Sequence, residues 1–363
     1  MLLTRRLAAV GLPGGPAAVV EEPLAPATWT QFHGEVRQHH LEGRLDQAIA
    51  EGAMAVTEEQ HELVLTSFSQ RCVALVTLDR EVVHVHRTLE AERIPSRVLK
   101  GTAHAHLLYD QPGTRTYVDV DVLVPSGAID DARHALERAG GTRTYAEPRP
   151  GFDRRFGKGA TFTMPSAHGV DLHRTLTTGA YGLSVIEADL FSSASWFSVA
   201  GERMRALDPI NMFLHCCLTV GLEPGARLAS QRDLAELALG PELDPFRVLS
   251  RATQWRMLAV VAAAVGRSWE QLDLDPTHPW AEWATTYVPS RRERRWMAPY
   301  VAPGATYAGQ TLGAIEAIPG WRPKLAYLRA MAMPDPDTGR EPWPDRARTA
   351  WRALQAWRPT DPR

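Results

Sequence analysis

The sequence predicts an α+β fold in which a small mixed β-sheet lies between an N-terminal and a C-terminal helical region. From Phe68 to Leu89 apolar residues recur at steps of three and four, which is the spacing of one helix face. Residues 116–124 instead alternate β-branched and acidic residues with a period of two, as strands do. After about residue 185 the helical pattern returns and dominates.

Length and composition are those of a folded protein with two or three domains. The chain has 363 residues, of which 44% are hydrophobic and 23% charged, close to a typical globular protein. The formal charge of −2 gives no bulk basicity, so we expect no long nucleic acid as a partner. The three cysteines form no disulfide framework, which fits a reducing compartment. The most apolar late run, 257–265, is far shorter than the roughly 20 residues of a membrane span, so we expect a cytoplasmic protein without a membrane partner.

The chain divides into five segments. Gly and Pro residues at 12–16 cut short the apolar patch that follows Arg5 and Arg6, which favours a loosely ordered leader. Pro95 lacks a backbone N–H and so ends the first helical region. The predicted segments are the leader (1–29), an N-terminal helical region (30–93), the mixed core (94–184), a C-terminal helical domain (185–298) and a Pro- and Trp-rich end (299–363).

Short strands and helices alternate within the core segment. Gly101-Thr102 predicts a tight turn that opens a helix directly after a strand. Residues 148–158 are rich in Gly and Arg, and they predict a loop or a mobile flap. Strands are expected at 97–100, 116–124, 160–164 and 169–173, and a further helix at 128–139.

The expected strand 116–124 carries two carboxylates on one side. Side chains two apart on a strand share a face, so Asp119 and Asp121 would repel each other unless a cation lies between them. A divalent cation with oxygen ligands is one solution, and an exposed edge strand is the other. Asp171, in an apolar context in another expected strand, adds a third carboxylate. If these strands are neighbours, the three carboxylates converge and suit a site for two divalent ions.

The Gly101-Thr102 turn adds a second part to this site. Backbone N–H groups at the start of a helix, together with the Thr102 hydroxyl, could hold phosphate oxygens. Carboxylates combined with such a turn indicate metal-assisted phosphoryl or nucleotidyl transfer.

An ordered series of motifs over about 60–240 carries a resemblance to a known family. The motifs are Lys100-Gly-Thr-Ala, Leu107-Leu-Tyr109, Pro112-Gly113, Arg115, Asp119-Val-Asp-Val-Leu-Val124, Asp171-Leu-His173 and Leu207-Asp-Pro209. This series resembles the nucleotidyltransferase superfamily, specifically a little-characterised bacterial nucleotidyltransferase family. The resemblance implies a palm like that of DNA polymerase β, a short mixed sheet with the three aspartates on adjacent strands.

The resemblance also implies an activity. The enzyme would move a nucleoside monophosphate from an NTP to a hydroxyl or phosphate of a small-molecule or peptide acceptor, with Mg²⁺ (or Mn²⁺), and release pyrophosphate. Asp119 and Asp121 would hold both metal ions. Asp171 would complete the metal that activates the acceptor and would take the acceptor's proton.

Further residues have both a functional and a structural interpretation. Lys100 could meet the triphosphate or extend along the strand end, and Arg115 could neutralise phosphate or pair with Asp119. His173 and His215 could line the acceptor pocket, or could be core and helix-surface residues. The predicted nucleotide-binding residues are therefore Lys100, Gly101, Thr102 and Arg115, and the candidate acceptor pocket holds His173 and His215.

Two segments outside the strands that carry the aspartates each have two interpretations. The cations of the 148–158 loop could close over a nucleotide or be solvated; they are Arg149, Arg154, Arg155 and Lys158, interleaved with Phe152 and Phe156. The Trp residues from Trp321 to Trp357 favour packing against the helical domains over a stacking platform.

Two other functions compete with nucleotidyl transfer. An Asp-x-Asp pair also occurs in glycosyltransferases, where it would bind one Mn²⁺ and a nucleotide sugar; Gly101-Thr102 and Asp171 argue against this. The other alternative is an inactive nucleotidyltransferase-like binding or antitoxin-like module, against which the presence of all three carboxylates argues.

Overall fold

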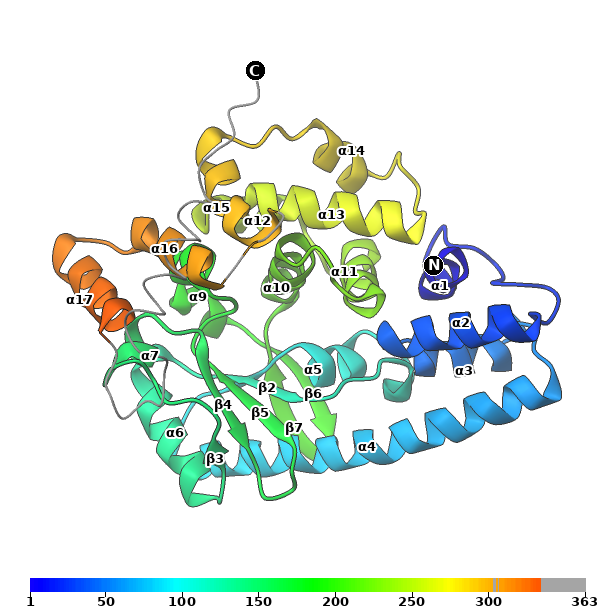
Figure 1. Cartoon of the computed structure of the whole chain (residues 1–363), viewed down its shortest axis with the longest axis horizontal. Helices are drawn as coiled ribbons and strands as arrows, with labels where there is room; N and C mark the ends of the chain where they lie inside the picture. Colours follow the sequence, from blue (N-terminus) through cyan, green and yellow to red (C-terminus); the bar gives the residue numbers. More distant parts are fainter. Residues whose placement is uncertain (303–304, 306, 334–363) are drawn as a thin grey trace.

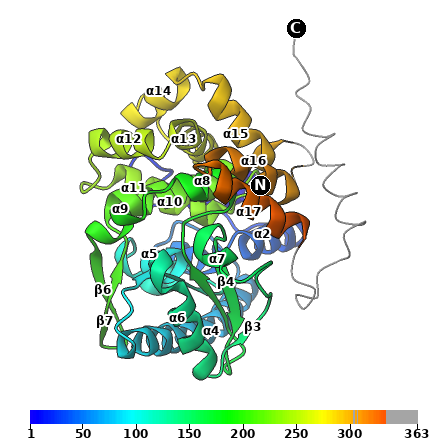
Figure 2. The same cartoon turned by 90° about the vertical axis from the view of Figure 1, so that its left-hand side faces the viewer.

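A seven-stranded mixed sheet forms the centre of the chain, seen here in a computed structural model that describes residues 1–302, 305 and 307–333 (Figures 1 and 2). The strand order is β3-β4-β5-β2-β1-β7-β6. Helices α4 and α6 lie on one side of the sheet, and α10, α11 and α13 lie on the other (Figure 1). The strands are β1 (Arg97–Val98), β2 (Val120–Leu123), β3 (Thr142–Arg143), β4 (Gly159–Thr163), β5 (Gly169–His173), β6 (Ser195–Val199) and β7 (Glu202–Ala206).

Two strands at the centre of the sheet are parallel although they are separated in sequence. β2 pairs with β5 so that Asp121 lies opposite Asp171 and Leu123 opposite His173. β1 pairs antiparallel to β2, and β4 pairs antiparallel to β5. The carboxylates that the sequence placed on two separate strands therefore lie on neighbouring ones.

The N-terminal region is helical, as its periodicity predicts. It contains α1 (Leu2–Ala9), α2 (Pro26–Gln38), α3 (Glu42–Ala50) and α4 (Glu58–Ala91). A capping box starts α4: Gln60 N–H donates to the Thr57 hydroxyl, and the Thr57 N–H donates to the Gln60 side chain. The buried stripe of α4, which includes Leu78, Val82 and Leu89, faces the sheet and the other core helices.

The first residues differ from the expected loosely ordered leader. Leu2–Ala9 form α1, and Leu7, Ala8 and Ala9 are completely buried. This helix contacts α11 (Leu228–Leu239) and α13 (Leu258–Leu272). The short apolar patch before Gly11 therefore acts as a docking helix, because it finds an apolar surface far along the chain.

The strand expected at 116–124 is shorter in the structure, and Asp119 lies one residue before it. The residues before β2 contact neighbouring helices and pair with none of the strands in the described part of the chain. The Tyr117 hydroxyl donates a hydrogen bond to Asp79 of α4. Arg115 extends toward α11. The 97–100 strand is likewise limited to Arg97–Val98.

Residues 195–206 form a β-hairpin where only helices were expected. β6 and β7 pair antiparallel, with Phe197 opposite Met204, and β7 joins the main sheet by pairing parallel to β1. Ala200 and Gly201, both with positive φ, make the two-residue turn. Phe197, Val199 and Met204 are buried, so buried and exposed residues do alternate here, but the alternating stretch of sequence is short.

The remaining helices cover the sheet and build the C-terminal part. α5, α6 and α7 alternate with strands, whereas α10 is buried on nearly every side, as a helix apolar all round should be. The bounds are α5 (Lys100–Leu107), α6 (Ile129–Arg138), α7 (Phe152–Arg155), α8 (Gly179–Ser184), α9 (Glu187–Ser192), α10 (Pro209–Leu222), α11 (Leu228–Leu239), α12 (Pro245–Gln254), α13 (Leu258–Leu272), α14 (Pro279–Thr286), α15 (Arg291–Val301), α16 (Tyr307–Ala317) and α17 (Trp321–Ala332), with short 3₁₀ turns η1 (Pro112–Thr114) and η2 (Ser126–Ala128).

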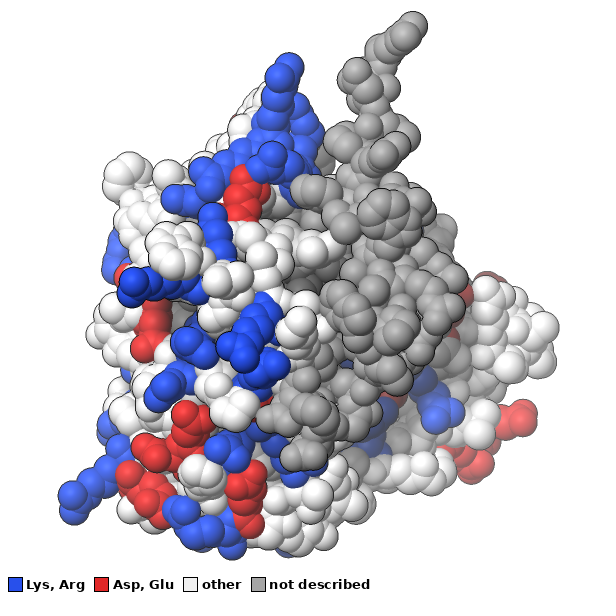
Figure 3. All heavy atoms as spheres, turned by 60° about the vertical axis from the view of Figure 1, so that its left-hand side comes forward, with Lys and Arg blue, Asp and Glu red and all other residues white. Residues whose placement is uncertain are grey.

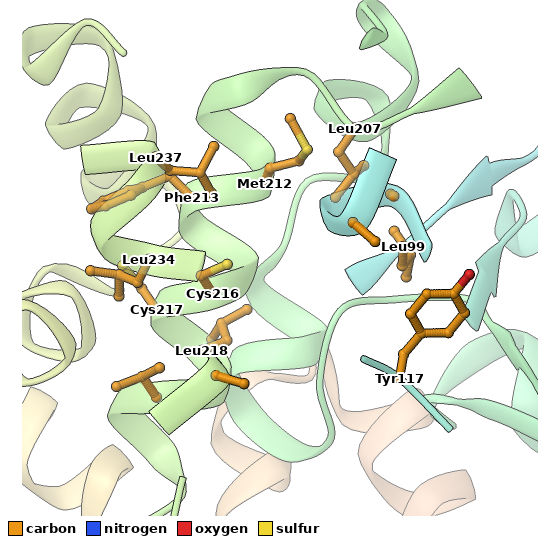
Figure 4. Packing of buried hydrophobic residues seen from close by; sticks show 14 of the residues in the cluster. Leu99, Tyr117, Leu207, Met212, Phe213, Cys216, Cys217, Leu218, Leu234 and Leu237 are labelled. Atoms are coloured by element: carbon orange, nitrogen blue, oxygen red, sulfur yellow. The ribbon is translucent and has the colours of Figure 1, made fainter. Parts of the chain in front are cut away.

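One large core joins these elements. Figure 4 shows Phe213, Cys217 and Leu234 of α10 and α11 packed together, with Leu99 and Tyr117 of the sheet side nearby. A second, smaller cluster joins α7 to α16 and α17; it consists of Phe152, Ala314, Ile318, Tyr327 and Ala330. Most of the Trp321–Trp357 stretch lies outside the described residues. No helix in the described part of the chain combines the length and apolarity that a membrane span requires.

Candidate active site

Three side chains meet where β2 and β5 run in parallel. One ligand atom each from Asp121, Asp171 and His173 can be chosen so that all lie within 4.8 Å of one another. His173 Nε2 is 2.6 Å from Asp121 Oδ1, and both residues are buried. Two carboxylates and an imidazole are ligands that divalent metals accept, so this set is a candidate metal centre.

Asp119 lies beside this set and shares its electrostatic field. It is partly exposed at the N-terminal end of β2. Burial, together with the negative charges of Asp121 and Asp171, raises the pKa of Asp119 to about 6. Removing one proton from this group is costly because the carboxylates repel each other, and a bound cation would relieve that repulsion.

Two lysines provide the positive charge next to the carboxylates. Lys100 Nζ is 3.2 Å from Asp121 Oδ1, and the attraction of this carboxylate outweighs burial and raises the lysine pKa. Burial would raise the pKa of Asp121, but Lys100 and His173 outweigh it and hold that pKa well below its usual range. Lys158, which precedes β4, has a pKa lowered by burial and by Lys100.

The sequence interpretation placed Lys158 only among the cations of a loop. The structure brings it to the carboxylates because Gly159, the next residue, pairs with His173 at the end of β5. The signal available in the sequence was its position directly before a strand.

A groove of about 360 Å³ opens on this cluster. One wall comes from the start of α5 and from the segment before β2, and the other from the end of α10 and the start of α11. The lining residues include Lys100, Gly101, Arg115, Tyr117, Asp119, Asp121, Thr219, Glu223, Arg227 and Ser230. The groove has the size of a small-molecule site and contains charges of both signs.

The Gly101-Thr102 pair forms the first turn of α5, as the sequence predicted. Gly101 lines the groove, but a Cβ there would lie 2.5 Å from Tyr117 Cβ, so close packing against Tyr117 already requires glycine. The Thr102 side chain is only 1% exposed and does not line the groove. The turn therefore contributes to the groove through Gly101, and Thr102 does not line it.

Arg115 pairs with Asp233 of α11, and not with Asp119. Arg115 Nε lies 2.9 and 3.0 Å from the two Asp233 oxygens, and Nη2 lies 2.8 Å from Oδ2. His104 and Tyr109 also reach this carboxylate, at 3.1 and 2.8 Å. Arg115 still lines the groove, so it serves as a brace at its edge.

The two histidines of the candidate acceptor pocket are both inside the protein. His173 is 1% and His215 is 2% exposed, and neither lines the groove. Burial lowers the pKa of both imidazoles. His173 acts at the carboxylates through Asp121, whereas His215 lies behind them on α10.

The family comparison decides the class of the protein. A family model described as uncharacterised nucleotidyltransferase matches residues 25–267. The chain belongs to this family. It is therefore an enzyme of the nucleotidyltransferase class, and the resemblance carried by its motifs is confirmed.

Two solved structures of nucleotidyltransferase type are similar to parts of this nucleotidyltransferase. The solution structure of the antibiotic-resistance factor ANT(2″)-Ia is 15% identical, covers 48% of this chain and 90% of its own, and has a TM-score of 0.35. An antigenic nucleotidyltransferase-like protein from Paracoccidioides brasiliensis is 13% identical, covers 59% and 94%, and has a TM-score of 0.36. No curated protein matches the chain.

Proposed function

We propose that this nucleotidyltransferase moves a nucleoside monophosphate from an NTP to a hydroxyl or phosphate of a small-molecule or peptide acceptor. The reaction uses a divalent cation, Mg²⁺ or Mn²⁺, and releases pyrophosphate. The observation that carries this proposal is the parallel pairing of β2 with β5, which brings Asp121 and Asp171 together next to Asp119.

The donor set fits a divalent cation. Asp119, Asp121 and Asp171 would hold it, and His173 keeps Asp121 oriented through the 2.6 Å contact. When bound, such a cation neutralises phosphate charge and aligns the reactants. Three carboxylates gathered on neighbouring strands with two lysines are otherwise hard to explain, since burial and the repulsion within the cluster raise the pKa of Asp119.

The groove beside Lys100 is the candidate nucleotide site. Lys100 and Gly101, in the first turn of α5, both line it, so the Lys100 ammonium and the backbone N–H groups of that turn would bind triphosphate oxygens. Arg227 adds a cation from the opposite wall. The choice among the four nucleotide bases would depend on the side chains of this opposite wall, at the end of α10 and the start of α11.

Asp171 is the candidate proton acceptor. Its Oδ1 accepts a hydrogen bond from the Thr161 hydroxyl at 2.7 Å, which fixes the orientation of the carboxylate. It lies on the β4 side of Asp121 and does not line the groove beside Lys100, so we expect the acceptor to approach from that side.

The test is calorimetric binding of each of the four NTPs with and without Mg²⁺. We expect metal-dependent binding in the wild type and nearly complete loss of it in Asp119→Asn and Asp121→Asn. Asp131→Asn, which removes an exposed carboxylate of α6, is the matched control and should bind as the wild type does.

Product analysis completes the test. Pyrophosphate released from an NTP in the presence of an acceptor supports the proposal. Metal-dependent NTP binding that persists unchanged in Asp121→Asn contradicts it, as does turnover of a nucleotide sugar in place of an NTP.

A further inference from the structure

A pocket lined by arginines lies outside the groove, between α7 and α17. It has a volume of about 390 Å³, and Phe152, Phe156 and Trp321 add aromatic surface to it. These helices are at the left of Figure 1, and Figure 3 shows Lys and Arg side chains gathered on the face that this side brings forward. Its arginines are Arg149, Arg155, Arg322 and Arg329.

A second hollow of about 590 Å³ continues this pocket. The two share Arg155, Phe156 and Arg322, and the second adds Arg174. We call the joined hollow the arginine pocket. Its size is that of a small-molecule site, and it is lined by five arginines.

The arginines of the pocket form no salt bridge with the carboxylates of the described residues, although Glu187 and Asp153 attract Arg174 from beyond salt-bridge distance. Within residues 1–302, 305 and 307–333, none of its five arginines has a carboxylate oxygen within 4.0 Å. The carboxylate of α7, Asp153, pairs with Arg143 instead. Guanidinium groups that line one pocket without a paired carboxylate are free to bind an anion.

Arg174 connects the pocket to the catalytic strands. Its Nε donates to Gly157 O at 2.8 Å and its Nη1 lies 3.4 Å from Ser126 Oγ. Its Nη2 is buried without a hydrogen-bond partner among the described residues. Arg174 also lines the second hollow, so its guanidinium is held in place beside the pocket with one nitrogen still without a partner in the part of the chain that the structure describes.

The arginine pocket lies on the Asp171 side of the active site. Arg174 follows His173 directly, and its backbone N–H donates to Lys158 O at 2.7 Å. A narrow hollow of about 20 Å³ is lined by Phe156, which also lines the arginine pocket, and by Lys158, whose charge acts on Asp121. The groove beside Lys100 is on the β1–β2 side, so the two sites flank the carboxylates from opposite strands.

We propose that the arginine pocket binds a phosphate group of the acceptor, so that the acceptor of this enzyme is a small phosphorylated molecule. The inference rests on the proposed function, because it assigns the second substrate of the same reaction. Guanidinium groups match phosphate oxygens in geometry and charge, and the aromatic side chains provide a surface for an apolar or planar part of the same molecule.

Phenyl phosphate is the probe, because it combines a phosphate monoester with an aromatic ring. Calorimetry is done in EDTA, so that metal-dependent binding at the groove is absent, with inorganic phosphate and phenol in parallel. We expect one molecule of phenyl phosphate to bind, inorganic phosphate to bind more weakly, and phenol to bind least.

Substitutions inside and outside the arginine pocket test where phenyl phosphate binds. Arg155→Gln combined with Arg322→Gln removes two exposed arginines and should weaken phenyl phosphate at least tenfold. Arg247→Gln, an exposed arginine of α12, is the matched control and should leave the affinity unchanged. Asp121→Asn should also leave it unchanged, because the carboxylates are not part of the pocket.

Several outcomes overturn the inference. These are no binding of phenyl phosphate, equal loss in Arg247→Gln, full binding in the double variant, and dependence on both Mg²⁺ and Asp121. Binding of a decathymidylate through the same arginines without binding of phenyl phosphate overturns it in favour of single-stranded nucleic acid. Failure of the proposed function is read separately, from metal-dependent NTP binding, which the double variant should retain.

Discussion

At the scale of single residues, the polar neighbours of the site contact different carboxylates. His173 and Lys100 both contact Asp121, whereas the Thr161 hydroxyl contacts Asp171. Asp121 is therefore held as a buried anion, and Asp171 stays partly exposed with one oxygen oriented. Under the proposed function, this difference suits Asp121 to cation binding alone and Asp171 to proton transfer as well.

Asp171→Asn should separate binding from chemistry. The variant keeps Asp119 and Asp121, so NTP with Mg²⁺ should still bind, while turnover should fall by about 10²–10⁴-fold because a general base is lost. Thr161→Val is the matched control; it removes only the hydrogen bond to Asp171 and should lower turnover much less. Steady-state rates with the identified acceptor check this, and a wild-type rate in Asp171→Asn would make Asp171 structural.

Gly101→Ala should destabilise the protein. The new Cβ would lie 2.5 Å from Tyr117 Cβ, so the chain must shift, at a cost of about 1–3 kcal/mol. Gly34→Ala is the control, because it lies in α2 with no atom within 4 Å of its Cβ, and alanine there should stabilise by about 0.5–1 kcal/mol. Urea unfolding measures both. If Gly101→Ala weakens NTP binding with no loss of stability, the glycine serves the phosphates and not Tyr117.

At the scale of elements, a buried brace joins the catalytic segment to the C-terminal helices. Asp233 of α11 accepts hydrogen bonds from Arg115 and Tyr109, and its Oδ2 lies 3.1 Å from His104 Nδ1 of α5. Burial would raise the pKa of Asp233, but Arg115 and His104 outweigh it and hold the pKa well below its usual range. The brace fixes the start of α5, and with it the Lys100 wall of the groove, against α11.

Asp233→Asn should reduce the free energy of unfolding by about 3–5 kcal/mol at pH 7, because it leaves Arg115 buried without its counter-ion. Because the native pKa of Asp233 is lowered, its contribution is complete above the unfolded-state value of about 3.9 and is lost as the pH falls toward the native value. The difference between wild type and variant should therefore be constant from pH 6 to 8 and shrink below pH 4. Urea unfolding across this range tests the sign, with Asp131→Asn as control; a gap that widens in acid contradicts it.

At the scale of the whole molecule, the N-terminal and C-terminal helical regions share one core. Leu7 of α1, Leu89 of α4 and Trp255 after α12 all belong to the same buried cluster. The sheet lies between α4 and the helices α10, α11 and α13, so the groove is formed only when α10 and α11 are in place above it (Figure 1).

Leu7→Ala should therefore destabilise the whole protein. Leu7 is completely buried, and the truncation should cost about 2–5 kcal/mol. Leu2→Ala is the matched control in the same helix; Leu2 is 73% exposed, and its loss should change stability little. Thermal unfolding followed by far-UV circular dichroism and by tryptophan fluorescence should shift together in Leu7→Ala. A variant with wild-type stability would mean that α1 does not belong to the core.

The sequence alone was sufficient for what depends on local pattern. The three-and-four spacing from Phe68 to Leu89 predicted α4, and the alternation around Val120 and Val170 predicted β2 and β5. Both signals are local, because burial on one face of an element repeats with that element's own period. The resemblance to the nucleotidyltransferase superfamily was also stated from the sequence, and the family model confirms that membership.

Tertiary structure decided what depends on contacts between distant residues. Pattern could not show that Arg115 pairs with Asp233, that Lys158 reaches the carboxylates, or that the patch at Leu7 docks as a helix. The 195–206 hairpin was missed because its alternation is short and its position was set by pairing with β1. A charged or apolar side chain has many partners of suitable chemistry along 363 residues, and only the packing of the folded chain selects one of them.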